Sequence, residues 1–287
     1  MSKLRNPYDQ FDEALQKAFE ANLLAALLED VGTGDLTGQL VPEDTRVKAR
    51  VLVREEAVLC GAPWFEGVMR ALDHSIRIEW NYAEGDLMEA NSVVCTIDAP
   101  PRSLLTAERS ALNFMQLLSG VATTTRKYVE VVAGTNARIL DTRKTVPGLR
   151  QAQKYAVRVG GGQNQRMALY DGILIKENHI AAAGGVTQAL KAAEQLGAGV
   201  PVQVEVETLA QLEEALAAGA KSVLLDNFDL DMMRAAVRLN EGRALLEASG
   251  GVNMNTVRAI AETGVDRISI GALTKDVRAV DYSLRII

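Results

Sequence analysis

The sequence is poor in the residues that build disulfide frameworks and zinc sites. It contains two cysteines, Cys60 and Cys95, and two histidines, His74 and His179. Two cysteines cannot form a disulfide framework, and both lie in short apolar runs, so we expect buried thiols. With so few histidine and cysteine side chains, a zinc site is not expected either.

Long apolar runs and an excess of positive charge are also missing. The longest apolar run is about eight residues, too short for a membrane span or a secretory signal, so we expect a soluble cytoplasmic protein with no membrane partner. Lysine and arginine number 31 against 37 acidic residues, a net charge of −6. This balance argues against a nucleic-acid partner but leaves room for a local basic pocket. The G-x-x-x-x-G-K-[ST] motif of a P-loop is absent.

The first hundred residues mix helix and strand signals. Apolar residues recur every four positions from Leu15 to Leu27, which predicts an amphipathic helix over 11–29. Alternating apolar residues predict strands near 47–53 and 76–80. A long helix follows Pro100 and Pro101, and we expect it to break near Ser119 and Gly120.

From residue 137 onward, short apolar strands alternate with helices. The predicted strands are 137–141, 172–176, 202–206, 222–226, 244–248 and 267–270. The last four end about 20 residues apart, the spacing of βα units in a parallel sheet. An open doubly wound sheet would also fit, but no strand is followed by G-x-G-x-x-G. We therefore favour an incomplete α/β barrel fused to an N-terminal α+β domain.

Charged residues follow the predicted strands in an orderly way. Arg143 and Lys144 follow the first strand, and Lys176 follows the second. Glu205 and Glu207 share a face of the third, since strand side chains alternate with a period of two. Inward carboxylates are costly unless cations or a metal compensate them, and Asp226 ends the next strand. In a βα barrel, such strand ends form the active site.

Glycines follow the last two strands, at 250–251 and at 271. Glycine allows backbone N–H groups to approach an anion closely, and loops after the last strands of a barrel are the usual phosphate site. With Arg166 and Arg109 added, the cations indicate a site for a polyanion such as a phosphorylated sugar. The carboxylates suit Mg²⁺ or a developing positive charge.

Several runs together resemble the quinolinate phosphoribosyltransferase family. Two of them are especially specific: Asp-Thr-Arg-Lys-Thr at 141–145 and Leu-Ile-Lys-Glu-Asn-His-Ile at 174–180. The other matching runs are 106–114, 118–122, 146–150, 154–157, 160–162, 204–207, 224–228 and 271–274. They span nearly the whole chain in the family's order.

The resemblance implies an N-terminal α/β sandwich domain (1–118, joined by the C-terminal tail 275–287) and an incomplete, about seven-stranded α/β barrel (119–274). It implies transfer of phosphoribose from phosphoribosyl pyrophosphate to quinolinate, with loss of pyrophosphate and CO₂, to give nicotinate mononucleotide for NAD synthesis. It also implies Mg²⁺ as the cofactor.

The resemblance assigns roles to individual residues. Lys144, Glu205 and Asp226 are expected to be catalytic, and Glu205 and Asp226 to serve Mg²⁺. The expected substrate-binding residues are Arg109, Thr142, Arg143, Lys144, Gln165, Arg166, Lys176, Glu205, Asp226, Ser249, Gly250, Gly251, Gly271, Ala272 and Leu273. Planar recognition of the two carboxylates of quinolinate favours arginine.

Two features of the resemblance bear on details. The family usually has histidine where this chain has Gln165, which can still donate a hydrogen bond but carries no charge. The arginine that matches Arg109 enters the active site of the neighbouring subunit in the family, which implies a homodimer or an assembly of dimers.

Three alternatives remain at this stage. A molybdenum-transport-associated relative of the same fold would act on another base. A lysine at a strand end, Lys144 or Lys176, could form a Schiff base in a lyase or aldolase. A non-catalytic binding protein on this scaffold should have lost charged site residues, whereas this chain lacks only the histidine.

Overall fold

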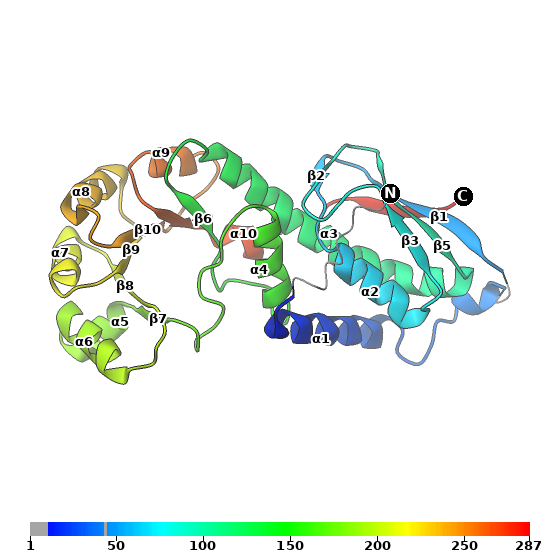
Figure 1. The fold of residues 1–287 in the computed structure, drawn as a ribbon, viewed down its shortest axis with the longest axis horizontal. Coiled ribbons are helices and arrows are strands. Elements are labelled where there is room, and N and C mark those ends of the chain that lie inside the picture. The colour runs from blue at the N-terminus through cyan, green and yellow to red at the C-terminus, as the bar shows by residue number, and fades with distance from the viewer. Residues whose placement is uncertain (1–10, 43–44) are drawn as a thin grey trace. The chain divides into compact units, whose positions relative to one another are not determined.

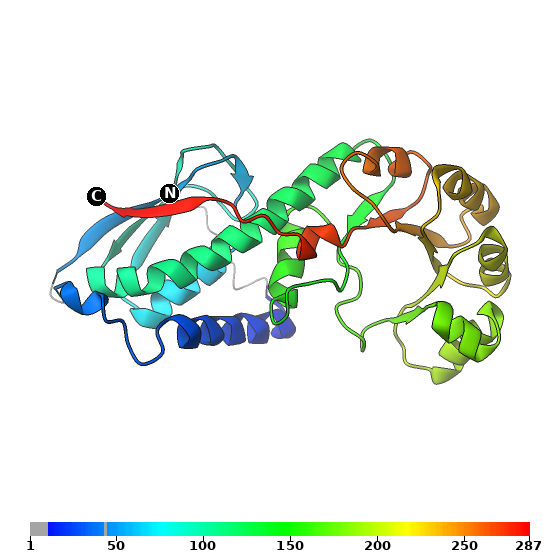
Figure 2. The same cartoon turned by 180° about the vertical axis from the view of Figure 1, so that it is seen from behind.

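The computed structural model describes residues 11–42 and 45–287 and divides the chain into two compact units (Figures 1 and 2). The first unit comprises Met1–Arg126, Val146–Gly161 and Asp276–Ile287, and the second comprises Lys127–Thr145 and Gly162–Lys275. The boundary near residue 126 lies eight positions beyond the expected one at 118, and the segment 146–161 groups with the first unit. No helix in the described part of the chain is long and apolar enough to cross a membrane.

An antiparallel sheet forms the frame of the first unit, in the order β12-β1-β5-β3, and a two-stranded β2-β4 sheet accompanies it. The strands are β1 (Val47–Val53), β2 (Ala57–Val58), β3 (Arg77–Trp80), β4 (Leu87–Met88), β5 (Val93–Ala99) and β12 (Tyr282–Ile286). The helices are α1 (Glu13–Asp30), α2 (Ala62–Leu72), α4 (Arg150–Val159) and most of α3 (Pro101–Val131). Because β12 pairs with β1, the C-terminal tail completes this sheet.

Aromatic side chains form the centre of the helical layer. Trp64 of α2 lies 5.4 Å from both Phe19 of α1 and Tyr155 of α4, measured between ring centroids. Trp64 is fully buried, as are both cysteines. The Tyr155 hydroxyl donates to the half-buried Glu84 carboxylate, whose oxygens also accept the N–H groups of Gly61 and Ala62 at the start of α2. Helix α4, drawn from later in the chain, is therefore an integral part of this unit.

The predicted break in the long helix is wrong: α3 runs without interruption through Ser119 and Gly120. Ser119 is fully buried and its hydroxyl bonds to the backbone N–H and C=O of Cys60. A Cβ at Gly120 would lie 2.3 Å from the carbonyl oxygen of Arg278. Gly120 therefore permits close packing of the C-terminal segment against the helix and does not end it.

The second unit is a parallel, six-stranded sheet in the order β6-β11-β10-β9-β8-β7. Its strands are β6 (Arg138–Leu140), β7 (Ile173–Ile175), β8 (Val202–Val206), β9 (Ser222–Asp226), β10 (Leu245–Ser249) and β11 (Arg267–Ser269). Its helices are α5 (Glu177–Ala183), α6 (Val186–Leu196), α7 (Leu209–Ala217), α8 (Leu230–Asn240), α9 (Val257–Ala261) and α10 (Ala272–Lys275). All six predicted strands are confirmed, with bounds that shift by at most two residues.

The sheet curves into an incomplete barrel, as predicted (Figures 1 and 2). The helices lie outside the strands, while β6 and β7, at the two ends of the strand order, do not pair. Beside β6, Gln163 forms a single parallel bridge with Leu140, which marks a rudimentary seventh strand. The expectation of about seven strands thus corresponds to six regular strands and one bridge.

The register assigns side chains to the two faces of the barrel sheet. Glu205 is opposite Leu224, Leu224 is opposite Glu247, and Ser249 is opposite Asp226. Paired residues of parallel strands point to the same face, so these side chains share the inner face. Val204 and Val223, one residue out of phase, are fully buried on the helix-covered face.

Substitution of Gly120 by alanine tests the packing of α3. Helix propensity alone favours alanine over glycine by about 1 kcal/mol. The Arg278 carbonyl leaves no room for a Cβ, so we expect Gly120→Ala to destabilise the protein by about 1–3 kcal/mol. Thermal unfolding measures the change, with Lys127→Ala at an exposed position of α3 as the control. A melting temperature equal to or above that of the wild type would contradict the packing.

Candidate active site

The predicted site residues gather at the edge where the six parallel strands end. Thr142, Arg143 and Lys144 follow β6, and Lys176 follows β7. The others at this edge are Glu205, Asp226, Ser249, Gly250, Gly251, Gly271, Ala272 and Leu273. The side chain of Leu273 is buried in the core, so only its backbone can face a ligand.

Lys176 and Glu205 form an ion pair across two neighbouring strands. The Lys176 Nζ lies 3.3 Å from Glu205 Oε2, with the lysine side chain 45% exposed and the glutamate side chain 12% exposed. The backbone N–H of Lys176 donates to Nδ1 of His179, which fixes the turn from β7 into α5. The pair therefore places one cation and one carboxylate at a defined position on the edge.

The Glu205 carboxylate lies in a partly buried and partly acidic environment. Burial raises its pKa above the usual value, Lys176 opposes that shift, and the charges of Asp226 and Glu177 raise it further. Asp226 is thus close enough to Glu205 for their negative charges to interact. A cationic ligand between these two carboxylates would relieve their repulsion.

Two arginines of the predicted site lie close enough for their charges to interact. Burial lowers the pKa of the Arg166 guanidinium from its usual value, and the positive charge of Arg143 lowers it further, against the opposing charge of Asp171. The Arg166 Nη1 donates to the carbonyl of Gly172 at 2.9 Å. Guanidinium groups that repel one another in a half-buried site are suited to a ligand with carboxylate or phosphate groups.

Lys144 packs against the glycine that follows the last barrel strand. A Cβ at Gly271 would lie 3.0 Å from Lys144 Cδ and 3.6 Å from Thr142 Oγ1. The Lys144 N–H donates to Thr142 Oγ1, and its carbonyl accepts from Thr274 Oγ1. The loop after β6 and the loop after β11 therefore form one continuous surface around Lys144.

The glycine pair after β10 is required by its neighbours. Gly250 and Gly251 have φ of +98° and +62°, a region that side chains disfavour. A Cβ at Gly250 would lie 2.1 Å from Oδ1 of Asn227, whose Nδ2 donates to Asp226. The exposed backbone of this loop is thus held beside the acidic pair.

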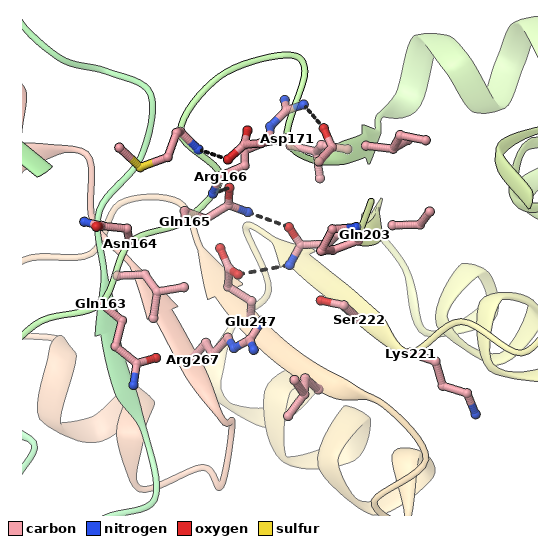
Figure 3. A pocket seen from close by; sticks show the side chains of 18 residues that line it. Gln163, Asn164, Gln165, Arg166, Asp171, Gln203, Lys221, Ser222, Glu247 and Arg267 are labelled. Atoms are coloured by element: carbon pink, nitrogen blue, oxygen red, sulfur yellow. Dashed lines mark hydrogen bonds between the residues drawn. The ribbon is translucent and has the colours of Figure 1, made fainter. Parts of the chain in front are cut away.

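A cavity of about 540 Å³ is lined by the first residues of β7 to β11 and by Gln165 and Arg166 (Figure 3). Gln165 Nε2 donates to Gln203 Oε1 at 2.7 Å, and Gln203 Nε2 donates to Glu247 Oε2 at 2.9 Å. The segment at Gln165 is tied to the end of β6, because Asp141 accepts from the Gln165 backbone N–H and from Asn164 Nδ2. The Gln165 amide is therefore engaged within the protein.

The sequence analysis did not single out Gln203 and gave Glu247 no role. Gln203 precedes Glu205 by two positions on β8, and Glu247 precedes Ser249 by two on β10. The same period-two rule that pairs Glu205 with Glu207 also pairs Glu205 with Gln203. Polar residues at this period within otherwise apolar strands were the available signal.

Glu207 and Arg109 lie apart from these interactions. Strand β8 ends at Val206, and Glu207 lies beyond it with an exposed side chain. The strand alternation that relates Glu205 to Glu207 therefore does not bring Glu207 into the site. Arg109 is an exposed residue of α3 in the first unit.

The potential for metal binding rests on Glu205 and Asp226. Among residues 11–42 and 45–287, no group of three or more histidine, cysteine, aspartate or glutamate side chains is arranged to hold a metal ion. Two neighbouring carboxylates suit a hard, largely hydrated cation that keeps most of its ligands as water or phosphate oxygen.

Comparison with known proteins identifies relatives over almost the full chain. The family models "Quinolinate phosphoribosyl transferase, N-terminal domain" and "C-terminal domain" match residues 35–119 and 121–285. A probable nicotinate-nucleotide pyrophosphorylase (carboxylating) of Bacillus subtilis is 42% identical over 260 residues, 90% of each chain. A nicotinate-nucleotide pyrophosphorylase (carboxylating) of Mycobacterium leprae is 42% identical over 269 residues, 90% of this chain and 94% of that protein.

A solved structure agrees with these relatives. The nicotinate-nucleotide pyrophosphorylase from Francisella tularensis superposes with a TM-score of 0.92 at 45% identity, and the match covers 94% of this chain and 96% of that one. The two family models match in chain order, and the C-terminal match begins before the first barrel strand and includes all six. The chain therefore belongs to the quinolinate phosphoribosyltransferase family.

Proposed function

We propose that this protein transfers the phosphoribosyl group of phosphoribosyl pyrophosphate to quinolinate and releases pyrophosphate and CO₂, which gives nicotinate mononucleotide for NAD synthesis. The observation that carries the proposal is that one unit of the chain contains both the Lys176–Glu205 ion pair beside Asp226 and the interacting guanidinium groups of Arg143 and Arg166. The named relatives support the same reaction. Both substrates are charged small molecules, and we place the enzyme in the cytoplasm.

Quinolinate is a pyridine ring with two adjacent carboxylates, and its recognition needs several fixed cations. The guanidinium groups of Arg143 and Arg166 repel each other, and a dicarboxylate bound between them would neutralise that repulsion. Lys144 and Lys176 would add point charges at the two flanking strand ends. These four residues orient the ring so that its nitrogen faces the ribose.

The ribosyl carbon passes through an oxocarbenium-like state when pyrophosphate leaves. Glu205, held by Lys176 at 3.3 Å, would stabilise the positive charge that develops on the ribose. Once the ring nitrogen is alkylated, its positive charge stabilises the electron pair that remains on C2 when the 2-carboxylate leaves as CO₂, and a proton from solvent then takes up that pair. Cations that bind the 2-carboxylate stabilise it before it leaves, so the cationic ring nitrogen supplies the driving force for decarboxylation.

The 5′-phosphate and the pyrophosphate need separate sites. The segments 249–251 and 271–273 would offer backbone N–H groups to the phosphate, and Thr142 lies beside Gly271. Glu205 and Asp226 would hold Mg²⁺ through water, and the ion would neutralise the leaving pyrophosphate.

Parallel assays with three bases test the proposal. Purified protein with phosphoribosyl pyrophosphate and Mg²⁺ should form nicotinate mononucleotide from quinolinate and release one CO₂ for each product molecule. Nicotinate and nicotinamide should give no product, because neither has the 2-carboxylate of quinolinate. Product from nicotinate with none from quinolinate would overturn the proposal and favour a relative that acts on another base.

Metal dependence follows from the acidic pair. Chelation should abolish turnover, and Mg²⁺ should restore it. Asp226→Asn removes one of the two charges and should raise the Mg²⁺ concentration needed for half-maximal rate by about tenfold, since a charged contact is worth roughly 1.5–3 kcal/mol. Asp231→Asn on the exposed face of α8 is the control. Full activity in excess chelator would contradict the role of the metal.

We propose a homodimer, or an assembly of dimers, in which Arg109 enters the partner's site. Arg109→Ala and Lys144→Ala should each be nearly inactive, because each removes a cation from every site. Mixed dimers of the two variants would carry both lesions in one site and none in the other. Since random pairing makes half the dimers mixed, about a quarter of wild-type activity should return.

The control for this experiment is subunit exchange, measured with differently tagged chains. If exchange is complete and mixing restores no activity, Arg109 does not act across a subunit interface.

A further inference from the structure

Three side chains inside the barrel cavity form a directed series of hydrogen bonds that ends at Arg166 (Figure 3). Glu247 on β10 accepts from Gln203 on β8 at 2.9 Å, and Gln203 accepts from Gln165 at 2.7 Å. Gln165 Oε1 then accepts the backbone N–H of Arg166 at 2.6 Å. Residues from two strands and one loop are thus connected in series.

The backbone N–H of Arg166 sets the direction of this series. Because an N–H group can only donate, Gln165 presents its oxygen to Arg166 and its NH₂ group to Gln203. Gln203 then presents its NH₂ group to Glu247, which accepts it. Each of the two amides therefore has one orientation that satisfies both of its neighbours.

Burial makes the series costly to break. Gln203 is 7% exposed and Glu247 is 1% exposed. In the described part of the chain, Oε1 of Glu247 is buried without a hydrogen-bond partner, so the carboxylate is satisfied by Gln203 alone. Loss of the Gln203 amide would leave a buried carboxylate unsatisfied.

The cavity itself explains why hydrogen bonds are needed here. The segment 163–167 lines a space of about 540 Å³ and is not enclosed by packed side chains on that side. Among its polar contacts are Asp141 at one end, the Gln165 amide in the middle, the Gly172 carbonyl at the Arg166 guanidinium, and Asp171 at the Met167 N–H. The Gln165 amide is the one of these that connects the segment to the barrel strands β8 and β10.

We propose that Gln203 and Glu247 are positioning residues for quinolinate binding, which act through Gln165 on Arg166. The inference rests on the proposed function, in which Arg166 binds a substrate carboxylate. It gives Gln165 an indirect role: its amide fixes the segment that carries Arg166 and does not itself hold the substrate. Selectivity for the dicarboxylate would then depend on the inner barrel layer as well as on the strand ends.

The test compares Gln203→Met, which removes the amide at similar size, with Gln203→Glu, which places two buried carboxylates side by side. Each should raise the KM for quinolinate by about tenfold or more, with the KM for phosphoribosyl pyrophosphate unchanged and kcat altered less than about threefold. Ser222→Ala lines the same cavity outside the series and should leave all three constants unchanged.

A double variant that exchanges the two residues, Gln203→Glu with Glu247→Gln (the exchanged pair), gives a more specific test. It keeps one carboxylate and one amide, and the new carboxylate can accept from both Gln165 and the new amide. Its KM for quinolinate should return to within about twofold of the wild type, since every hydrogen bond of the series can re-form. Failure of this exchange to rescue Gln203→Glu in folded protein would overturn the proposed direction of the series.

Hydrogen exchange of the peptide 163–172 provides a readout that does not depend on activity. Gln203→Met should accelerate its exchange, and the exchanged pair should restore it. Unchanged exchange in Gln203→Met would overturn the series, as would faster exchange with an unaltered KM for quinolinate. A wild-type protein that does not use quinolinate would instead overturn the proposed function, and the positioning role with it.

Discussion

The ion pair between Lys176 and Glu205 is the interaction on which the arrangement of the candidate site depends. It joins the ends of two adjacent parallel strands and holds a carboxylate that is mostly buried. Asp226, on the next strand along, adds a second negative charge at the same edge. Without Lys176, two carboxylates would face each other in a partly desolvated place, which is costly unless a metal or another cation intervenes.

Polar side chains on the inner face of the barrel form two layers, one at this edge and one below it. The outer layer carries the charged residues at the strand ends, and the inner layer carries Gln203 and Glu247 beside a cavity. Because side chains on one face recur every second residue, each inner polar residue stands directly below a site residue of the same strand. The strands therefore connect the chemistry at the edge to the hydrogen bonds beneath it.

The sequence predicted most of this architecture because buried parallel strands read as apolar runs. The strands 202–206 and 222–226 coincide with β8 and β9, and the charges placed at their ends, Glu205 and Asp226, lie where expected. Lys176 was likewise predicted at the end of β7, although its ion pair with Glu205 depends on the strand order, which the sequence does not state.

The remaining features depend on contacts between distant segments. Gly120 was expected to break α3. Its lack of a side chain instead allows the backbone of Arg278, more than 150 positions later, to pack against the helix. The hydrogen bonds of Gln203 to Gln165 and Glu247 could not be predicted, because the three residues come from separate segments of the chain. The grouping of α4 with the first unit follows from Tyr155 and Trp64, and no local pattern in 146–161 signals it.

The central claim is that quinolinate lies among Arg143, Lys144, Arg166 and Lys176 at the carboxyl ends of β6 and β7. A crystal structure of the protein with bound quinolinate tests it most directly. The account predicts density for the ring at this edge, with its carboxylates within hydrogen-bond distance of at least two of these four side chains. Well-defined quinolinate elsewhere, with these four side chains unengaged, would contradict it.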